Sequence, residues 1–208
     1  AQYYQDSSKV ILDGNVKMYN NSDSLFCNQL HLIKGPNERY DASGDVIFYQ
    51  DNYIISSQNL TYFTIDNTIE ASTNIVIKDN QRIIYGDNLL INYIDSTISN
   101  LEMNNNIRLF DSQFYYFKGN SSRQILDDKM QSKNLFIDFD NNGDIKIVKL
   151  EGMVKADFNV VSDSLLKGVN SVSGDTMFIQ FDNKSISSMD IKGGVIGQFQ
   201  PDRNNKKL

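Results

Sequence analysis

Apolar and polar residues alternate along most of the chain with a period of two. Around Val16, apolar side chains stand at Val10, Leu12 and Met18, whereas Lys17 is charged. Successive side chains of a strand point to opposite faces of a sheet, so this spacing predicts strands that bury one face. An amphipathic helix needs apolar spacings of three and four, and no stretch of the sequence shows them convincingly. The pattern therefore predicts an all-β protein.

The alternating stretch recurs six times along the chain. The centres of the copies lie about 30 residues apart at first, and roughly 47 and 41 residues apart at the end. Two positions before each centre stands a narrow or turn-forming residue, such as Gly14 or Gly44. Units of this length cannot bury an apolar face alone, so they must stack. We predict about six two-strand repeats in one elongated antiparallel array, centred on Val16, Val46, Ile75, Ile107, Val154 and Val195.

A second motif lies between successive centres, and we predict a bend in it. In the segment around Gln29, the apolar positions are even before Gln29 and odd after it, as Leu25 and Leu30 illustrate. One extra residue exchanges the two faces of a strand, so the change of parity predicts a β-bulge or corner. A small residue precedes each corner and lets the backbone bend. These small residues are Cys27, Ser57, Gly86, Ser132 and Gly174.

The connections are rich in Asn, Asp and Gly, as hairpin loops require. Segment 119–128 accounts for the longest interval, and we predict that it is an extended loop; segment 157–171 is interpreted as a second long excursion. No break in composition divides the chain. We therefore expect a single domain over residues 1–200, followed by a polar tail over 201–208.

Charge and hydropathy exclude several classes of partner. The formal net charge is −6, and the sequence has no basic stripe that could neutralise phosphates, so we expect no nucleic-acid partner. No run of about 18 apolar residues is present to span a bilayer as a helix. The chain begins with Ala-Gln and not with Met, which we interpret as the result of signal-peptide removal or of trimming.

The residues that could carry chemistry each have a structural interpretation that we favour. His31 is the single histidine and should point outward, whereas a metal site needs further ligands at suitable spacing. Cys27 occupies the small-residue position and has no histidine nearby to activate it. Gly86-Asp-Asn88 and Gly174-Asp-Thr176 fall at the predicted corners, where Asp and Asn favour local backbone hydrogen bonds.

Two further segments lead to the same conclusion. The acidic run 138–144 lacks the bidentate glutamate of a calcium loop at its expected place, so we interpret it as a solvated hairpin tip. The aromatic cluster 114–117 is interpreted as a strand end that covers an edge of the core. Since no carboxylate pair, nucleophile triad or phosphate-binding loop stands out, we predict no enzymatic activity, no metal site and no cofactor.

The repeat resembles the LptA/OstA-like family of periplasmic lipopolysaccharide-transport proteins. In one strand, an apolar residue is followed by any residue, Gly, Asp or Asn, and Val, as in 12–16. In the next strand, a small residue is followed by any residue, Asn or Thr, and Leu, as in 86–89. The resemblance covers residues 9–200 and is sharpest at 14–16, 44–46, 86–89 and 168–199. It implies a V-shaped β-jellyroll in the periplasm of a diderm bacterium. It leaves open a freestanding bridge, an inner-membrane-side homologue, or the soluble N-terminal domain of the outer-membrane translocon.

The resemblance also implies a function, that of a carrier or bridge whose apolar groove shields lipid acyl chains on the way to the outer membrane. Burying one methylene contributes about 0.8 kcal/mol, so a chain of about 12 carbons gains on the order of 10 kcal/mol at most. We expect contact with lipid at the inward positions of both motifs. These are Val16, Met18, Val46, Phe48, Leu60, Tyr62, Ile75, Ile77, Leu89, Ile91, Ile107, Leu109, Leu135, Ile137, Met177 and Ile179.

The implied partners are lipopolysaccharide or a similar glycolipid, and the jellyroll domains of the inner- and outer-membrane transport components. Unpaired strand edges invite pairing with another chain, so head-to-tail assembly through edges near residues 3–19 and 177–199 is also expected. Two alternatives stay open from the sequence. One is a β-solenoid scaffold or adhesin whose inward rows form a dry core without lipid, and the other is an enzyme of the polysaccharide-lyase type.

Overall fold

The structure, a computed structural model, describes residues 2–5, 8–20, 23–50, 52–95, 97–116, 123–183 and 185–202. Within these ranges the regular structure is entirely β-strand, which confirms the predicted all-β class. None of the described segments is an apolar helix that could cross a membrane. The strands are β1 (Gln2–Gln5), β2 (Lys9–Asn20), β3 (Asp23–Ile33), β4 (Arg39–Gln50), β5 (Tyr53–Phe63), β6 (Thr68–Lys78), β7 (Arg82–Ile94), β8 (Thr97–Tyr116), β9 (Arg123–Phe139), β10 (Ile145–Ser162), β11 (Leu165–Asp182), β12 (Ser185–Lys192) and β13 (Ile196–Pro201).

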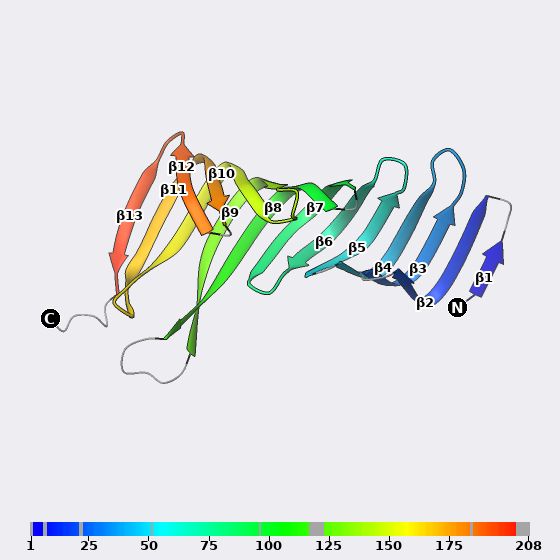
Figure 1. The fold of residues 1–208 in the computed structure, drawn as a ribbon, viewed down its shortest axis with the longest axis horizontal. Helices are drawn as coiled ribbons and strands as arrows, with labels where there is room; N and C mark the ends of the chain where they lie inside the picture. Colours follow the sequence, from blue (N-terminus) through cyan, green and yellow to red (C-terminus); the bar gives the residue numbers. More distant parts are fainter. Residues whose placement is uncertain are drawn as a thin grey trace.

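All the strands belong to one antiparallel sheet that follows the order of the sequence. Each strand from β1 to β12 pairs with the next, and β13 pairs with β11. The strands succeed one another along the long axis of the molecule, from β1 at one end to β13 at the other (Figure 1). The sheet is therefore an open, elongated meander whose free edges lie at its two ends.

Where the structure describes them, the longer repeats contain longer strands. The segment 157–171 is part of the β10–β11 hairpin, whose pairing continues to Ser162 and Leu165. Residues 123–128 belong to β9, while 119–122 lie outside the described residues. The prediction of an extended loop is therefore wrong for 123–128, and the excursion over 157–171 stays within the sheet, because the extended backbone satisfies its hydrogen-bonding groups in the ladder.

A line of bulges crosses the sheet near the middle of the strands. In β2, Gly14 and Asn15 have positive φ angles of 84° and 49°, and both lie opposite Asn28 alone. Paired positive-φ residues recur at 44–45 in β4, 73–74 in β6, 105–106 in β8 and 152–153 in β10. The predicted parity change is confirmed in β3, where Leu25 and Leu30 are both buried. The extra residue, however, sits on the neighbouring glycine-containing strand.

At two corners the small residue is a serine that bonds to the backbone. Ser57 Oγ donates a hydrogen bond of 2.9 Å to the carbonyl of Asn59, and Ser132 Oγ donates one of 2.8 Å to the carbonyl of Asn134. The bulge removes one rung of the ladder beside these carbonyls, and the short hydroxyl supplies the missing donor. Cys27 occupies the same position in β3, and burial raises the pKa of its thiol. The reactive thiolate form of Cys27 is therefore disfavoured at this position.

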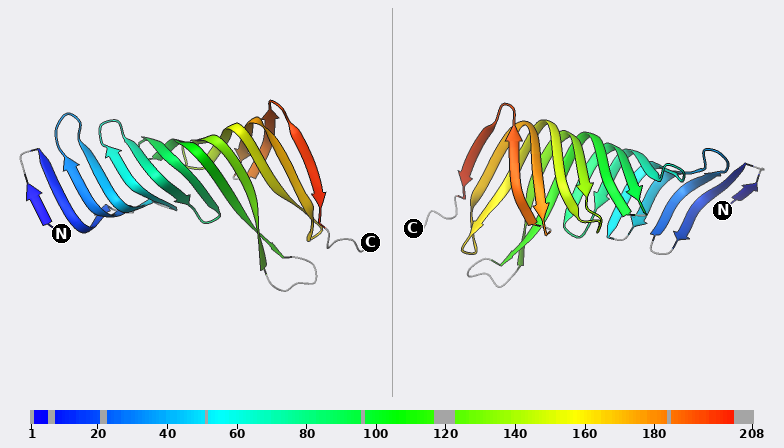
Figure 2. Two further views of the ribbon diagram at one scale, coloured as in Figure 1. Left: turned by 180° about the vertical axis from the view of Figure 1, so that it is seen from behind. Right: turned by 45° about the horizontal axis from the view of Figure 1, so that its top comes forward.

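The line of bulges divides the sheet into two parts that face each other. Half-sheet 1 lies on one side of this line and contains 9–13, the segments that pair with it strand by strand, such as 29–33 and 39–43, and β12. Half-sheet 2 lies on the other side and contains 16–20, the segments that pair with it strand by strand, such as 23–27 and 46–50, and β13. The phenolic hydroxyl of Tyr93 on β7 donates a hydrogen bond of 2.6 Å to Gln50 Oε1 on β4. Because these strands are not neighbours, only bending of the sheet brings them together, and its curvature is visible in Figure 2.

The facing parts are offset along the axis. The ring centroids of Tyr53 on β5 and Phe139 on β9 are 6.4 Å apart in an edge-to-face contact. Together with the bond between β4 and β7, this contact shows that a strand of half-sheet 2 faces a strand of half-sheet 1 that comes three or four strands later in the sheet. Between the two parts lies the core, in which Met103, Leu150 and Val154 are 0% exposed.

The two ends of the sheet are built differently. The edge near residues 3–19 is formed by β1, which pairs with residues 10–13 of β2, and by the rest of β2, which has no partner on that side among the described residues. At the other end, Gly193 and Gly194 have positive φ angles and interrupt the last strand, so β12 and β13 are its two halves. Val195 follows this break and is 54% exposed, because no further strand packs on it.

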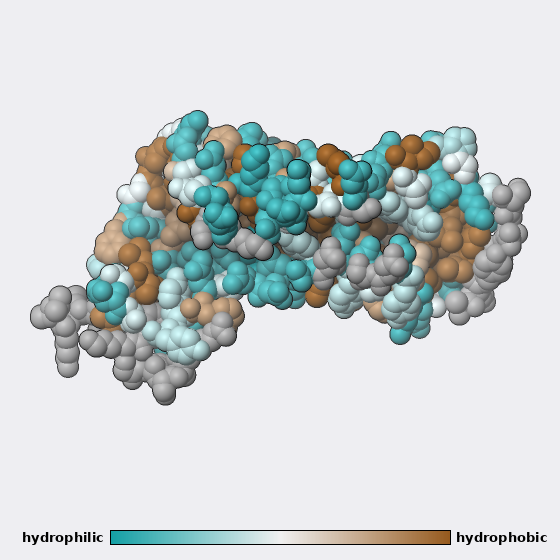
Figure 3. All heavy atoms as spheres, in the orientation of Figure 1, coloured by the Kyte–Doolittle hydropathy of each residue, from teal (hydrophilic) through white to brown (hydrophobic). Residues whose placement is uncertain are grey.

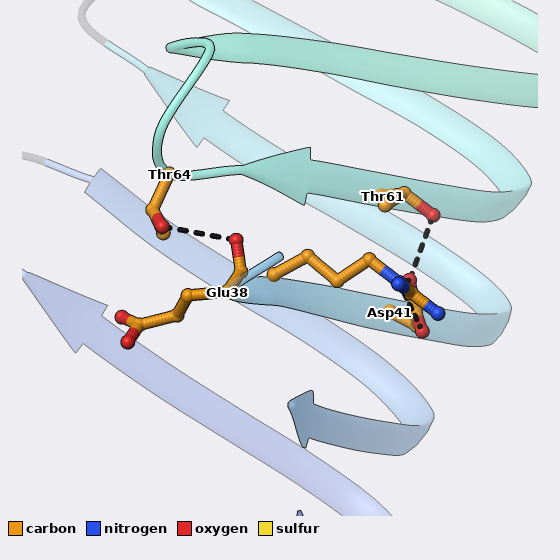
Figure 4. Close-up of polar contacts among 5 residues, drawn as sticks. Glu38, Asp41, Thr61 and Thr64 are labelled. Carbon is orange, nitrogen blue, oxygen red and sulfur yellow. Dashed lines mark hydrogen bonds and ion pairs between the residues drawn. The ribbon is translucent and has the colours of Figure 1, made fainter. Parts of the chain in front are cut away.

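A polar cluster on the outer face ties the β4–β5 hairpin together (Figure 4). Arg39 Nε and Thr61 Oγ1 both lie 3.1 Å from the Asp41 carboxylate. Thr64 donates from its hydroxyl and its backbone N–H to the carbonyl of Glu38, at 2.9 and 3.2 Å. These bonds fix the turn that follows β5 against the residue that precedes β4, and so fix one wall of the interior described next.

Candidate functional site in the interior between the half-sheets

The N-terminal end of the interior contains an open cavity with a volume of about 490 Å³. One wall comes from the ends of β2, β3 and β4 in half-sheet 2, and the other from β4 to β7 in half-sheet 1. Apolar side chains form more than half of the wall, and amide, hydroxyl and carboxylate groups form the rest. The lining residues are Met18, Tyr19, Asn20, Asp23, Leu25, Tyr40, Phe48, Gln50, Leu60, Tyr62, Thr64, Asn67, Ile69 and Tyr93. We refer to this space as the N-terminal cavity.

The interior becomes tightly packed towards the middle of the molecule. A cavity between Tyr53, Ile77, Leu109, Ile137 and Phe139 has a volume of only about 40 Å³. That volume is on the scale of one or two water molecules. The side chains of the two half-sheets therefore fill this part of the interior.

The C-terminal end of the interior opens again. A cavity of about 460 Å³ lies beside Phe158, Val172, Met189 and Phe199, and Phe199 is 50% exposed. Hydrophobic residues reach the surface around β2–β3 and around β12–β13, whereas hydrophilic residues predominate over the middle strands on the same face (Figure 3). Apolar surface is thus presented at both ends, while other exposed apolar residues, such as Ile94, Tyr116 and Met153, belong to the middle strands.

All sixteen predicted lipid-contact residues face the interior, but they have different surroundings. Met18, Phe48, Leu60 and Tyr62 line the N-terminal cavity, where three of them are only partly buried. Four others line the small central cavity, namely Ile77, Leu109, Ile137 and Ile179. The remaining eight are at most 5% exposed and pack in the core: Val16, Val46, Ile75, Leu89, Ile91, Ile107, Leu135 and Met177. The continuous open groove expected from the sequence is therefore interrupted by packed core.

Several polar residues of the N-terminal cavity were not predicted, among them Gln50, Asn67 and Tyr93. Asn67 exchanges hydrogen bonds with the backbone of Tyr93, and the Tyr62 hydroxyl donates to Asn67 Oδ1 at 3.1 Å. Gln50 accepts the bond from Tyr93 that joins the two half-sheets. Extending the alternation to the strand ends would have placed Gln50 and Tyr93 inside, because they continue the inward rows of Val46 and Leu89.

A row of charged side chains crosses β7, β8 and β9 beside the central cavity. Asp111 lies opposite Arg82 on one side and Asp128 on the other. Burial is the main cause that raises the pKa of the Asp111 carboxyl; Arg82 lowers that pKa, and the like charge of Asp128 raises it. Arg82 Nε also lies 3.5 Å from Asp79. The ionised form of Asp111 is therefore less favourable in the folded protein than in water.

We expect Asp111→Asn to raise the free energy of unfolding at pH 7 by about 0.5–1 kcal/mol, because it removes a like-charge pair and a desolvated carboxylate. The folded-state pKa lies above the unfolded value, so the folded wild type binds a proton more readily. The free energy of unfolding of the wild type therefore falls as the pH rises from the unfolded-state pKa of Asp111 through its folded-state pKa. Urea denaturation at pH 7 and pH 4 measures the effect, and the gain from the substitution should shrink at pH 4. A loss of stability at pH 7 would show instead that attraction to Arg82 dominates.

The other candidate residues have structural surroundings. Cys27 is buried. His31 is partly buried on β3, where its neighbours across the sheet are Ile11 and Asp41. Asp140 Oδ1 accepts hydrogen bonds from the backbone of Asn142 and Asp144, which closes the hairpin turn. The described residues contain no group of three His, Cys, Asp or Glu that could hold a metal ion.

The aromatic cluster 114–117 lies at the end of β8, where it extends beyond the central core. Phe114 is 38% and Tyr116 is 66% exposed, while Phe117 lies outside the described residues. These rings therefore lie away from the N-terminal cavity. Comparison with known proteins adds no assignment, since neither a protein-family model nor a curated protein matches the sequence.

Proposed function

We propose that this chain is part of a lipid carrier or bridge, a V-shaped β-jellyroll similar to the LptA/OstA-like family. Its interior would shield the acyl chains of lipopolysaccharide or a similar glycolipid in the periplasm of a diderm bacterium. The observation that carries the proposal is the N-terminal cavity, a space of about 490 Å³ with apolar walls on both facing half-sheets. Polar groups within a largely apolar wall suit an amphiphile, which brings a polar headgroup together with its alkyl chain.

The energetics of such a carrier require apolar burial and no reactive side chains. Each methylene that enters the cavity contributes about 0.8 kcal/mol, so a few methylenes already give measurable affinity. Longer acyl chains have to displace contacts between the half-sheets in the packed middle. Passage through the whole interior therefore requires the two half-sheets to separate there.

The two ends of the sheet suit continuation of the interior by another molecule. Because the facing parts are offset, each half-sheet extends beyond the other at one end of the molecule. Half-sheet 1 does so at β1–β3, and half-sheet 2 does so at β11 and β13. The exposed Met189 and Phe199 lie at the second of these ends. A jellyroll domain of a membrane component, or a second copy joined head to tail, would pair with the free edge and cover this surface.

Photo-crosslinking tests the proposal directly. A benzoylphenylalanine at Met18 or Phe48 should capture lipopolysaccharide in cells of a diderm host, because both positions line the N-terminal cavity. The same probe at Lys17 or Lys78, which are exposed on the outer face, is the matched control and should capture none. Equal capture at inner and outer positions, or none at either, would contradict a carrier.

A structural scaffold is the second candidate, and the packed middle of the interior favours it. The central cavity of about 40 Å³ has no room for an alkyl chain in this conformation. Native mass spectrometry with dodecyl maltoside separates the two functions. A carrier retains the amphiphile at a defined stoichiometry, whereas a dry scaffold does not.

A further inference from the structure

The tip of the β4–β5 hairpin lies where the N-terminal cavity ends and the packed middle begins. Gln50 is the last residue of β4 and Tyr53 the first residue of β5, so both belong to the tip of one hairpin in half-sheet 2. Gln50 lines the N-terminal cavity, and Tyr53 lines the central one. The hairpin tip therefore separates the two spaces.

This tip is fastened to the opposite half-sheet by two side-chain contacts. Gln50 Oε1 accepts the hydrogen bond from the Tyr93 hydroxyl at 2.6 Å, and the Tyr53 ring meets the Phe139 ring edge to face. Tyr93 is only 9% exposed, and its backbone is held by Asn67, whose carbonyl accepts the Tyr93 N–H at 3.1 Å. We refer to Gln50, Tyr53, Tyr93 and Phe139 as the clasp.

We propose that the clasp sets the length of alkyl chain that the N-terminal cavity accepts. The inference rests on the proposed carrier function and adds a specificity to it. A chain that fits between the open end of the cavity and the clasp binds without disturbing the fold. A longer chain must break the Gln50–Tyr93 hydrogen bond and part the two rings, because the space beyond them is packed. Affinity should then stop rising once the chain reaches the clasp.

A series of alkyl maltosides from octyl to tetradecyl tests the length limit by calorimetry or native mass spectrometry. With the wild type, we expect affinity to rise with each methylene and then reach a plateau within the series. With Gln50→Ala, which removes the side chain that bridges the half-sheets, the rise should continue at up to about fourfold for each added methylene. Tyr93→Phe removes only the hydroxyl and should move the plateau in the same direction.

Tyr62→Phe is the matched comparison. Its hydroxyl also lies in the N-terminal cavity, but it bonds to Asn67 within half-sheet 1 and not across the interior. This substitution should change affinity for all chain lengths alike and leave the plateau where it is. A plateau that moves equally in Tyr62→Phe and Tyr93→Phe would overturn the clasp, because polarity of the wall would then explain both.

A second measurement does not depend on any amphiphile. Cys27 is 5% exposed on the inner face of half-sheet 2, so its alkylation rate reports how often the two half-sheets separate. Gln50→Ala should accelerate alkylation severalfold relative to the wild type, and Tyr62→Phe should not. Unchanged rates in Gln50→Ala would overturn the clasp.

The two proposals fail in distinguishable ways. If wild-type affinity climbs without interruption to tetradecyl maltoside, the carrier function stands and the clasp is wrong. If no member of the series binds the wild type, the carrier function fails, and the length limit fails with it.

Discussion

Replacement of Ile91 by alanine is expected to lower the free energy of unfolding by about 3 kcal/mol, within the range of 2–5 kcal/mol typical of buried large-to-small changes. Ile91 lies on β7 with 0% of its surface exposed, in the packed core of the interior. The loss has two sources. The removed methyl and methylene groups no longer contribute their burial, and a cavity remains because rigid neighbours do not close the space. Both contributions require the interior to be filled at this position.

Met18→Ala is the matched control. Met18 also points into the interior, but it is only partly buried and borders the N-terminal cavity. Because space is already present beside it, we expect a loss of about 1 kcal/mol or less. Urea denaturation followed by circular dichroism measures both, since the protein contains no tryptophan to serve as a fluorescent probe.

The comparison decides how far the open part of the interior extends. A cost below about 1 kcal/mol for Ile91→Ala would mean that β7 borders open space in solution, as a continuous groove requires. A large loss of stability in Ile91→Ala together with a small loss in Met18→Ala would show that packed core lies next to an open end of the interior. The second result also predicts that lipid passing the middle must separate the half-sheets.

The inward rows were predictable because alternation is a local property of a strand. Phe48 and Ile137 were both placed inside from the sequence, and both are there. Their surroundings were not predictable, because Phe48 lines about 490 Å³ of space and Ile137 only about 40 Å³. Which strands face each other depends on twist and bending accumulated over many strands, and no single repeat encodes that sum.

The clasp illustrates the same limit on a smaller scale. Parity indicates that Gln50 and Tyr93 point inward, but they are 43 residues apart and lie on strands that do not pair. Only the offset of the half-sheets brings the two side chains within hydrogen-bonding distance. The long β10–β11 hairpin was missed for a different reason, since 157–171 was interpreted from repeat spacing and not from its own alternation.

The bulges that bend the sheet provide the second large effect, and Gly44→Thr is expected to lower the free energy of unfolding by about 3 kcal/mol. Gly44 has a φ angle of 76°, where a β-branched residue is strained by about 1–3 kcal/mol. A Cβ at this position would also lie 2.9 Å from Cβ of Asn28, so β3 would have to shift. Both effects act at the point where β4 passes from one half-sheet to the other.

Thr73→Gly is the converse substitution at the equivalent bulge of β6. Thr73 is a β-branched residue held at a φ angle of 69°. Glycine relieves left-handed strain of about 1–2 kcal/mol, offset by about 0.5–1 kcal/mol for its greater freedom in the unfolded chain, so we expect a net gain of about 0.5–1 kcal/mol. Urea denaturation of the two single variants measures the pair. If Thr73→Gly is instead destabilising, the threonine side chain contributes more at that bulge than its backbone strain costs, and bending of the sheet there does not depend on glycine-like geometry alone.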